Sequence, residues 1–89
     1  MRTEFLKSFY KDLDKLDKLE NVKNDVANAI ENVEAANRTT DIKNLKKLKG
    51  FKYAYRIKIH NYRIGIFIEK GVVEFAHVVH RKDIYTIFP

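Results

Sequence analysis

The sequence predicts an α+β fold, in which two helices cover one face of a twisted antiparallel sheet. In the first half of the chain, apolar residues recur at the three- and four-residue spacing of amphipathic helices. In the second half, apolar and polar residues alternate, as strands with one covered face require. Two short turn sequences divide this alternating region, which predicts a meander of separate strands.

The first half predicts a short N-terminal strand followed by a helical hairpin. The segment 2–9 can begin as a strand, and helical spacing starts at about Ser8, whose hydroxyl can accept a free amide of the first turn as an N-cap. A second helix is expected over 22–36, with Asn21 as its candidate cap. The two apolar stripes are Phe9, Leu13, Leu16 and Leu19, and then Val22, Val26, Ala29, Ile30 and Val33. Such stripes are typical of helices that pack on a core.

The second half predicts a basic link, three strands and a C-terminal helical turn. The link over 42–50 is anchored by Ile42, Leu45 and Leu48 and stopped by Gly50. The strands are expected at 53–59, 62–69 and 72–79. Two-residue turns at His60-Asn61 and Lys70-Gly71 join them, because Asn and Gly tolerate positive φ.

The first turn fixes a register that gathers positive charge on one face. If Ile59 closes the hairpin with Tyr62, then Lys58 faces Arg63 and Arg56 faces Gly65. Side chains alternate across a sheet, so the three cations share the face opposite the helices. Like charges directly opposite each other destabilise a sheet. Folding stability therefore does not explain why Lys58 faces Arg63, whereas an anion bound between them would explain it.

The second turn fixes the register of the last strand and so predicts which face its side chains share. Pairing Glu69 with Val72 sets Arg63 opposite Val78, and a straight strand places His80 on the cationic face. His77 is then a packed core histidine. Arg81 and Tyr85 are four residues apart, so one helical turn places both over the same patch. Gly65 is expected to leave the face uncluttered, and Ile84, Ile87 and Phe88 to pin the tail to the body.

Charge is distributed unevenly along the chain. Residues 1–41 contain seven Lys/Arg and nine Asp/Glu, a net charge of −2, whereas residues 42–89 contain eleven and three, a net charge of +8. This asymmetry favours a polyanionic partner for the second half, with a merely soluble basic surface as the alternative.

The sequence excludes several classes of site and of protein. The chain has no cysteine, which rules out disulfides and thiolate metal sites, and its three histidines have no metal-ligand spacing. It has no Gly-rich phosphate loop, no Ser/His/Asp arrangement and no pair of carboxylates. Without a signal peptide or a long apolar run, residues 1–89 are expected to form a single cytoplasmic domain with no membrane contact.

Four motifs in order, KKLKG, YRIKI, YRIGI and HRKDIY before the final FP, resemble the RelE branch of the RelE/ParE toxin superfamily over nearly the whole chain. The resemblance implies the RelE-like fold and the toxin of a type II toxin–antitoxin system. It implies a metal-independent endoribonuclease that needs no cofactor, an mRNA interferase that cuts mRNA in the ribosomal A site through attack of the 2′-OH. The partners implied are a RelB-like antitoxin, mRNA and the ribosome with its 16S rRNA, and the free toxin is expected to be a monomer.

Carried over by motif, the resemblance assigns the cleavage site. Arg63 and Arg81 hold the phosphate, where fixed cations stabilise developing charge. Lys58 and Arg56 lie on the 2′-OH side or stabilise charge. Tyr85 stacks on a splayed base. His80 is a candidate proton carrier because imidazole titrates near neutral pH, with a basic strand residue as the alternative.

Four lysines before the sheet are candidate contacts to ribosomal RNA phosphates: Lys43, Lys46, Lys47 and Lys49. A solvated helix or loop face explains them about as well. For the chain as a whole, two other functions stay open. One is the ParE-like branch, which shares the fold but poisons DNA gyrase, and the other is a non-catalytic module that binds RNA or an antitoxin.

Overall fold

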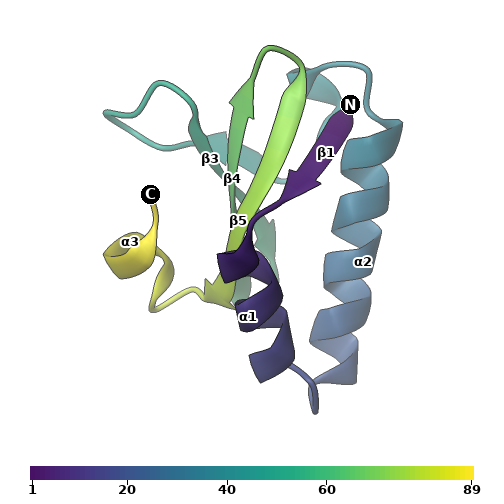
Figure 1. Cartoon of the computed structure of the whole chain (residues 1–89), viewed down its shortest axis with the longest axis vertical. Coiled ribbons are helices and arrows are strands. Elements are labelled where there is room, and N and C mark those ends of the chain that lie inside the picture. The colour runs from purple at the N-terminus through teal and green to yellow at the C-terminus, as the bar shows by residue number, and fades with distance from the viewer.

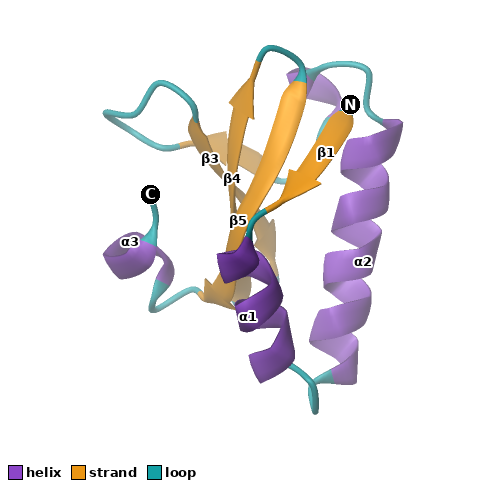
Figure 2. Ribbon diagram, viewed as in Figure 1, coloured by secondary structure: helices purple, strands orange, loops and turns teal.

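A computed structural model describes all 89 residues and confirms the α+β class. In chain order the elements are β1 (Arg2–Phe5), α1 (Lys7–Lys15), α2 (Glu20–Ala35), a 3₁₀ turn η1 (Thr39–Asp41), β2 (Leu45–Lys47), β3 (Ala54–Ile59), β4 (Tyr62–Glu69), β5 (Val72–His80) and α3 (Ile84–Ile87). The strands form one sheet in the order β1-β5-β4-β3-β2. Helices α1 and α2 lie on one side of this sheet and α3 on the other (Figures 1 and 2).

The predicted meander is confirmed, and the sheet gains a strand at each edge. β1 runs parallel to β5, so the sheet is mixed rather than purely antiparallel. Part of the predicted basic link is β2, which pairs antiparallel with β3. This segment was missed as a strand because Lys46 and Lys47 follow Leu45, which leaves no apolar alternation over its three residues. No helix of the chain is long and apolar enough to cross a membrane.

The main core lies between the sheet and the helical hairpin. It contains 13 buried residues, with Phe9 and Leu16 from α1 and its end, Val26 and Val33 from α2, and the inward side chains of β3, β4 and β5. The predicted stripes are therefore confirmed except at Leu19, which is 42% exposed because α1 ends at Lys15.

Both predicted helix caps are wrong, because α1 and α2 begin earlier than expected. Their N-cap residues are Leu6 and Leu19, and neither makes a side-chain cap hydrogen bond. Ser8 instead donates from its hydroxyl to the carbonyl of Ala76. One helical turn later, Asp12 accepts from the Val78 amide at 3.0 Å. These two side chains hydrogen-bond backbone groups of β5 that lie beyond the end of β1. Buried backbone polar groups require such partners.

Both predicted turns are present, and the first hairpin has the predicted register. Lys58 pairs with Arg63, and Arg56 with Gly65. In the first turn the positive φ is at His60 (56°) and not at Asn61, whereas in the second Lys70 and Gly71 both have positive φ (51° and 78°).

The predicted register between β4 and β5 is wrong by one residue beyond a β-bulge. Ile66 pairs with Phe75, but Gly65 pairs with His77, so Ala76 is the extra residue. A slip of one residue turns each later side chain to the other face. Arg63 therefore pairs with Val79 rather than Val78, and the two histidines exchange faces.

The C-terminal tail covers part of the face opposite α1 and α2. Ile84 and Phe88 join Leu48, Ala54 and Ala76 in a second cluster of five buried residues, which we call the tail cluster. The Phe88 ring lies directly on Gly65, where an added Cβ would meet its ring carbons at 2.7 Å. Gly65 thus serves close packing, and the prediction of an uncluttered surface is wrong. Ile87 is 43% exposed and does not pin the tail as expected.

Candidate functional site: a cationic face beside the C-terminal turn

The face of the sheet opposite α1 and α2 carries a group of positive charges. Lys46 on β2 pairs with Arg56 on β3, and Lys58 on β3 pairs with Arg63 on β4. We call these four residues and Arg81 the basic face. None of the five forms an ion pair with a carboxylate, and the Lys and Arg residues that do so all come from residues 2–38. Adjacent like charges without counter-charges create a positive potential that attracts anions.

Arg63 lies at the centre of these charges. Its Nη1 donates to the backbone carbonyls of His60 at 2.7 Å and Tyr62 at 2.9 Å, which holds the guanidinium beside the first turn. Burial lowers the pKa of Arg63, Arg56 and Arg81 lower it further through their charges, and Tyr85 opposes them. An arginine stays protonated nonetheless, so its remaining N–H groups can bind a phosphate oxygen.

The other cations differ in how firmly they are held. Arg56 donates from Nη1 to the Asn44 carbonyl at 3.0 Å, and its Nε is buried without a hydrogen-bond partner. Arg56 is therefore fixed against β2. Lys58 and Arg81 are exposed and form no hydrogen bond through their side chains.

Arg81 and Tyr85 both lie near enough to Arg63 to affect its pKa, which the charge of Arg81 lowers and Tyr85 raises. The Tyr85 side chain is 65% exposed, although Ile84 beside it is fully buried in the tail cluster. The tail thus anchors itself through Ile84 and presents an aromatic ring to solvent.

His80 does not lie on the basic face, in contrast to the prediction. It pairs with Tyr62, and its ring packs edge to face against the Tyr62 ring at 5.4 Å between centroids. Tyr62 itself packs against the main core. The bulge explains this position of His80, because beyond it each side chain of β5 points to the opposite face from the one predicted.

His77 occupies the face where His80 was expected, and sequence reasoning missed its partner. It is half-buried, its Nδ1 lies 2.8 Å from Oδ2 of the buried Asp12, and its ring packs against that of Phe88. Asp12 follows Phe9 by three residues and so lies on the apolar stripe of α1. The sequence signal for this contact was a carboxylate on an apolar helix stripe, because a buried acid requires a hydrogen-bonding or charged partner.

The four predicted RNA-binding lysines are distributed over different surfaces. Lys46 belongs to the basic face, whereas Lys47 pairs with Tyr55 and points to the other side of the edge strand. Lys49 lies in the loop beside Tyr85. Lys43 lines a separate hollow of about 470 Å³ between α2 and β3.

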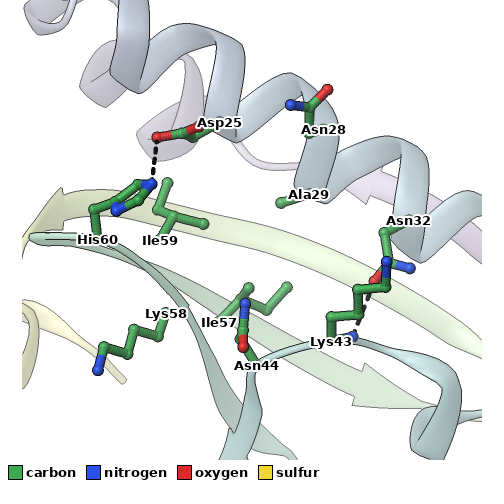
Figure 3. A pocket seen from close by; sticks show the side chains of 10 residues that line it. All are labelled: Asp25, Asn28, Ala29, Asn32, Lys43, Asn44, Ile57, Lys58, Ile59 and His60. Carbon is green, nitrogen blue, oxygen red and sulfur yellow. Dashed lines mark hydrogen bonds and ion pairs between the residues drawn. The ribbon is translucent and has the colours of Figure 1, made fainter.

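Most of the residues that line this hollow are polar, and Lys58 of the basic face is one of them. It is lined by Asn28 and Asn32 of α2 and by Asp25 and His60, whose Oδ2 and Nε2 atoms lie 3.5 Å apart. Figure 3 shows Lys58 at its rim, with the side chain extending away from the other lining residues. Among all these side chains, no group of three His, Asp or Glu is close enough to hold a metal ion.

Comparison with known proteins places this chain in a family. The family model described as the ParE toxin of the type II toxin–antitoxin system parDE matches residues 3–85. A curated relative, Toxin RelE3 of Methanocaldococcus jannaschii, is 38% identical over 90 residues that cover the whole of both chains. The chain therefore belongs to the RelE/ParE superfamily and is a RelE-family toxin of a type II toxin–antitoxin system.

Solved structures agree with this assignment. The chain matches the RelB-RelE antitoxin–toxin complex from Methanococcus jannaschii with a TM-score of 0.79 and 36% identity, covering 97% of this chain and 99% of that chain. YafQ from E. coli strain BL21(DE3) has the same fold, with a TM-score of 0.72 at 12% identity and coverage of 92% and 96%.

Proposed function

We propose that this toxin is an endoribonuclease that cuts mRNA in the A site of the translating ribosome. The observation that carries the proposal is the basic face, whose five cations lack carboxylate partners and meet an exposed tyrosine at the C-terminal turn. A single-stranded RNA offers phosphates for the cations and a splayed base for the ring.

Cleavage by this face uses the RNA's own 2′-OH as the nucleophile. The 2′-OH gives up its proton and its oxygen forms a bond to phosphorus, while the bond to the 5′ oxygen breaks and that oxygen takes up a proton. Negative charge builds on the phosphate oxygens during this exchange. Arg63 and Arg81 stabilise that charge, and hydrogen-bond donors to a developing oxyanion typically contribute a factor of about 10²–10³ each. Lys58 extends from the opposing strand, where it faces the 2′-OH side, and Arg56 adds positive charge from its fixed position.

Gyrase poisoning is the second candidate, because the matching family model carries the ParE name. The basic face favours the ribonuclease, because its pairing of Lys58 with Arg63 weakens the sheet and an RNA phosphate bound between the two side chains would relieve their repulsion. A non-catalytic binding module would share the cations but would leave mRNA intact.

A RelB-like antitoxin is the partner we propose for this toxin. The supporting observation is the match to the toxin of the RelB-RelE complex over nearly the entire length of both chains. An acidic antitoxin would complement the net charge of +8 carried by residues 42–89.

Primer extension on mRNA from a translating extract tests the proposed activity. The wild type should produce codon-phased cuts that vanish without ribosomes, and Arg81→Ala should slow them by about 100-fold or more. Lys82→Ala is the matched control, because Lys82 is also exposed but is no part of the basic face. Intact mRNA together with inhibited DNA supercoiling by gyrase would instead support the ParE-like function.

A further inference from the structure

The turn between β3 and β4 holds both of the arginines that we propose for the phosphate. Its two residues are His60 and Asn61. The carbonyl of His60 accepts the 2.7 Å hydrogen bond from Nη1 of Arg63. The carbonyl of Asn61 accepts another hydrogen bond of 2.7 Å, from the backbone amide of Arg81. The position of this turn therefore affects where the guanidinium of Arg63 lies and where the chain leaves β5 at Arg81.

The two arginines depend on this turn in different ways. Arg81 follows the last residue of β5, and its exposed side chain forms no hydrogen bond, so the contact of its backbone with the turn is what locates it. The second hydrogen bond of the Arg63 guanidinium is also made beside the turn, to the carbonyl of Tyr62 at 2.9 Å. The first turn is thus the structural element that both arginines share.

His60 has a backbone conformation that a side chain disfavours. Its φ is 56°, in the left-handed region that glycine adopts without steric cost. Two-residue hairpin turns with positive φ commonly contain Asn or Gly at such positions. Turn formation by itself therefore does not account for an imidazole at position 60.

The imidazole of His60 connects the turn to α2. Its Nε2 lies 3.5 Å from Oδ2 of Asp25, and Figure 3 shows the two side chains pointing toward each other between helix and sheet. We call this pair the Asp25–His60 contact. Both residues line two hollows, of about 470 and 580 Å³, which extend along α2 toward Asn32 and toward Asn21. The contact therefore crosses an otherwise open part of the boundary between α2 and the sheet.

Folding stability gives little reason for this arrangement. The His60 side chain is 83% exposed, and exposed pairs of ionisable groups typically contribute little to stability. The left-handed backbone at the same residue is itself unfavourable. What the contact does provide is a fixed place for the turn relative to α2, which is the longest helix of the chain.

We propose that Asp25 and His60 are positioning residues, which fix the first turn against α2 and thereby hold Arg63 and Arg81 in the geometry that the reacting phosphate needs. This positioning role rests on the proposed ribonuclease function, and neither Asp25 nor His60 needs to touch the RNA. Preorganised donors are effective because they need not reorient during the reaction, and a displacement of about 1 Å can slow a reaction by about 100-fold.

The second hairpin supplies a matched control, because its turn also begins with a side chain at positive φ. Lys70 has a φ of 51° and is no part of the basic face. His60→Gly and Lys70→Gly therefore relieve the same kind of backbone conformation at opposite ends of β4, and only His60→Gly removes a contact to α2. Asp25→Asn removes the charge of the other partner, with Glu31→Gln as its control on the exposed side of α2. We call His60→Gly and Asp25→Asn the contact variants.

Single-turnover cleavage of mRNA on the ribosome gives the first readout. We expect His60→Gly to lower the rate at saturating ribosome concentration by about 10- to 100-fold, and Asp25→Asn by at least about fivefold. The half-saturating ribosome concentration should change by less than about threefold, because the arginines remain present and only their placement is lost. Lys70→Gly and Glu31→Gln should stay within about twofold of the wild type, as exposed substitutions away from a site do. Unfolding midpoints should stay near the wild type in all four variants, because none of these side chains is buried.

Hydrogen exchange of the Arg81 amide gives a readout that does not depend on cleavage. This amide donates to the carbonyl of Asn61, so a displaced turn leaves it more open to solvent. We expect its exchange to be at least about fivefold faster in the contact variants and unchanged in the two controls. The Ile66 amide, in the centre of the sheet, is the internal reference for global opening.

The outcomes separate the positioning role from the ribonuclease. Cleavage by the wild type, with an unchanged rate and unchanged Arg81 exchange in His60→Gly, would overturn the positioning role and leave the ribonuclease intact. Equal losses of cleavage in His60→Gly and Lys70→Gly would also overturn it, since a glycine in either turn would then have the same effect. Faster Arg81 exchange without loss of cleavage would overturn it as well, because the turn would then move without consequence. Faster Arg81 exchange in the contact variants, with no cleavage by the wild type, would uphold the positioning of the tail and defeat the ribonuclease.

Discussion

The two faces of the sheet carry out different tasks. The face under α1 and α2 is apolar and contributes most of the main core of 13 buried residues, among them Ile64 and Phe75. The opposite face combines the basic face with the tail cluster, which contains only five buried residues. Folding stability is therefore concentrated on one side and unpaired charge on the other.

This difference indicates how a small domain supports a destabilising site. Cations opposite one another weaken the sheet, and the buried area on the helix side offsets that cost. The tail cluster couples the faces, because Phe88 packs on Gly65 of the central strand β4 while its neighbour Tyr85 stays in solvent. If this division holds, substitutions on the two faces affect different properties.

The largest expected effect on stability is in the main core. Phe75→Ala should lower the free energy of unfolding by about 3–5 kcal/mol, because Phe75 is fully buried and its ring stacks on Phe5 and contacts Phe9. For a domain of this size that is a large part of the total. Urea denaturation followed by circular dichroism measures the loss.

Phe88→Ala is the matched change on the other face. Its ring is also buried, but the tail can move away locally, so we expect a global loss of less than about 3 kcal/mol. mRNA cleavage should fall, because Tyr85 is no longer held. Equal losses of stability for the two variants, with cleavage preserved in Phe88→Ala, would contradict the division between the faces.

The next largest effect is expected at the edge of β5, where the two faces meet. Asp12→Ala leaves the Val78 amide without its acceptor and His77 without its partner, and this should cost about 1–3 kcal/mol. Ser8→Ala removes the hydrogen bond to Ala76 one helical turn away and should cost only about 0.5–1.5 kcal/mol.

Hydrogen exchange distinguishes a local role from a global one at this edge. In Asp12→Ala the Val78 amide should exchange faster than in Ser8→Ala when the two variants are compared at equal overall stability. Cleavage should also fall further in Asp12→Ala, because the bulge beside Val78 sets which residue of β5 stands opposite Arg63. Equal protection of the Val78 amide in both variants would show that Asp12 does not support the bulge.

Most of the fold could be predicted because its signals are local. Alternation and two turn dipeptides fixed three strands and the first register, including the pair of Lys58 with Arg63. The β1 strand had no predicted partner because parallel pairing is non-local, and β2 was missed because three mostly charged residues show no period.

The cationic part of the candidate site was also predictable, whereas the histidines were not. Arg56, Lys58 and Arg63 follow from one turn and the two-residue period of strands. The bulge at Ala76 lies opposite Gly65 of β4, but that glycine does not indicate which residue of β5 is the extra one, and the bulge is supported by Ser8 and Asp12 from a different part of the chain. A feature that depends on tertiary hydrogen bonds cannot be found by reading along one strand.

The smallest expected effect is at His80, and it tests the exchange of faces directly. A residue that transfers a proton in the reaction typically contributes about 10²–10⁴-fold to its rate. Because the His80 ring packs on Tyr62, away from Arg63, we expect His80→Gln to slow ribosomal mRNA cleavage by less than about threefold, well below that range. Lys58→Gln is the comparison, since Lys58 faces Arg63 and should cause a far larger loss. The measurement is the single-turnover cleavage rate of each variant. A loss of about 100-fold in His80→Gln would show that the ring leaves Tyr62 and reaches the RNA, and the sheet's faces would no longer separate stability from catalysis.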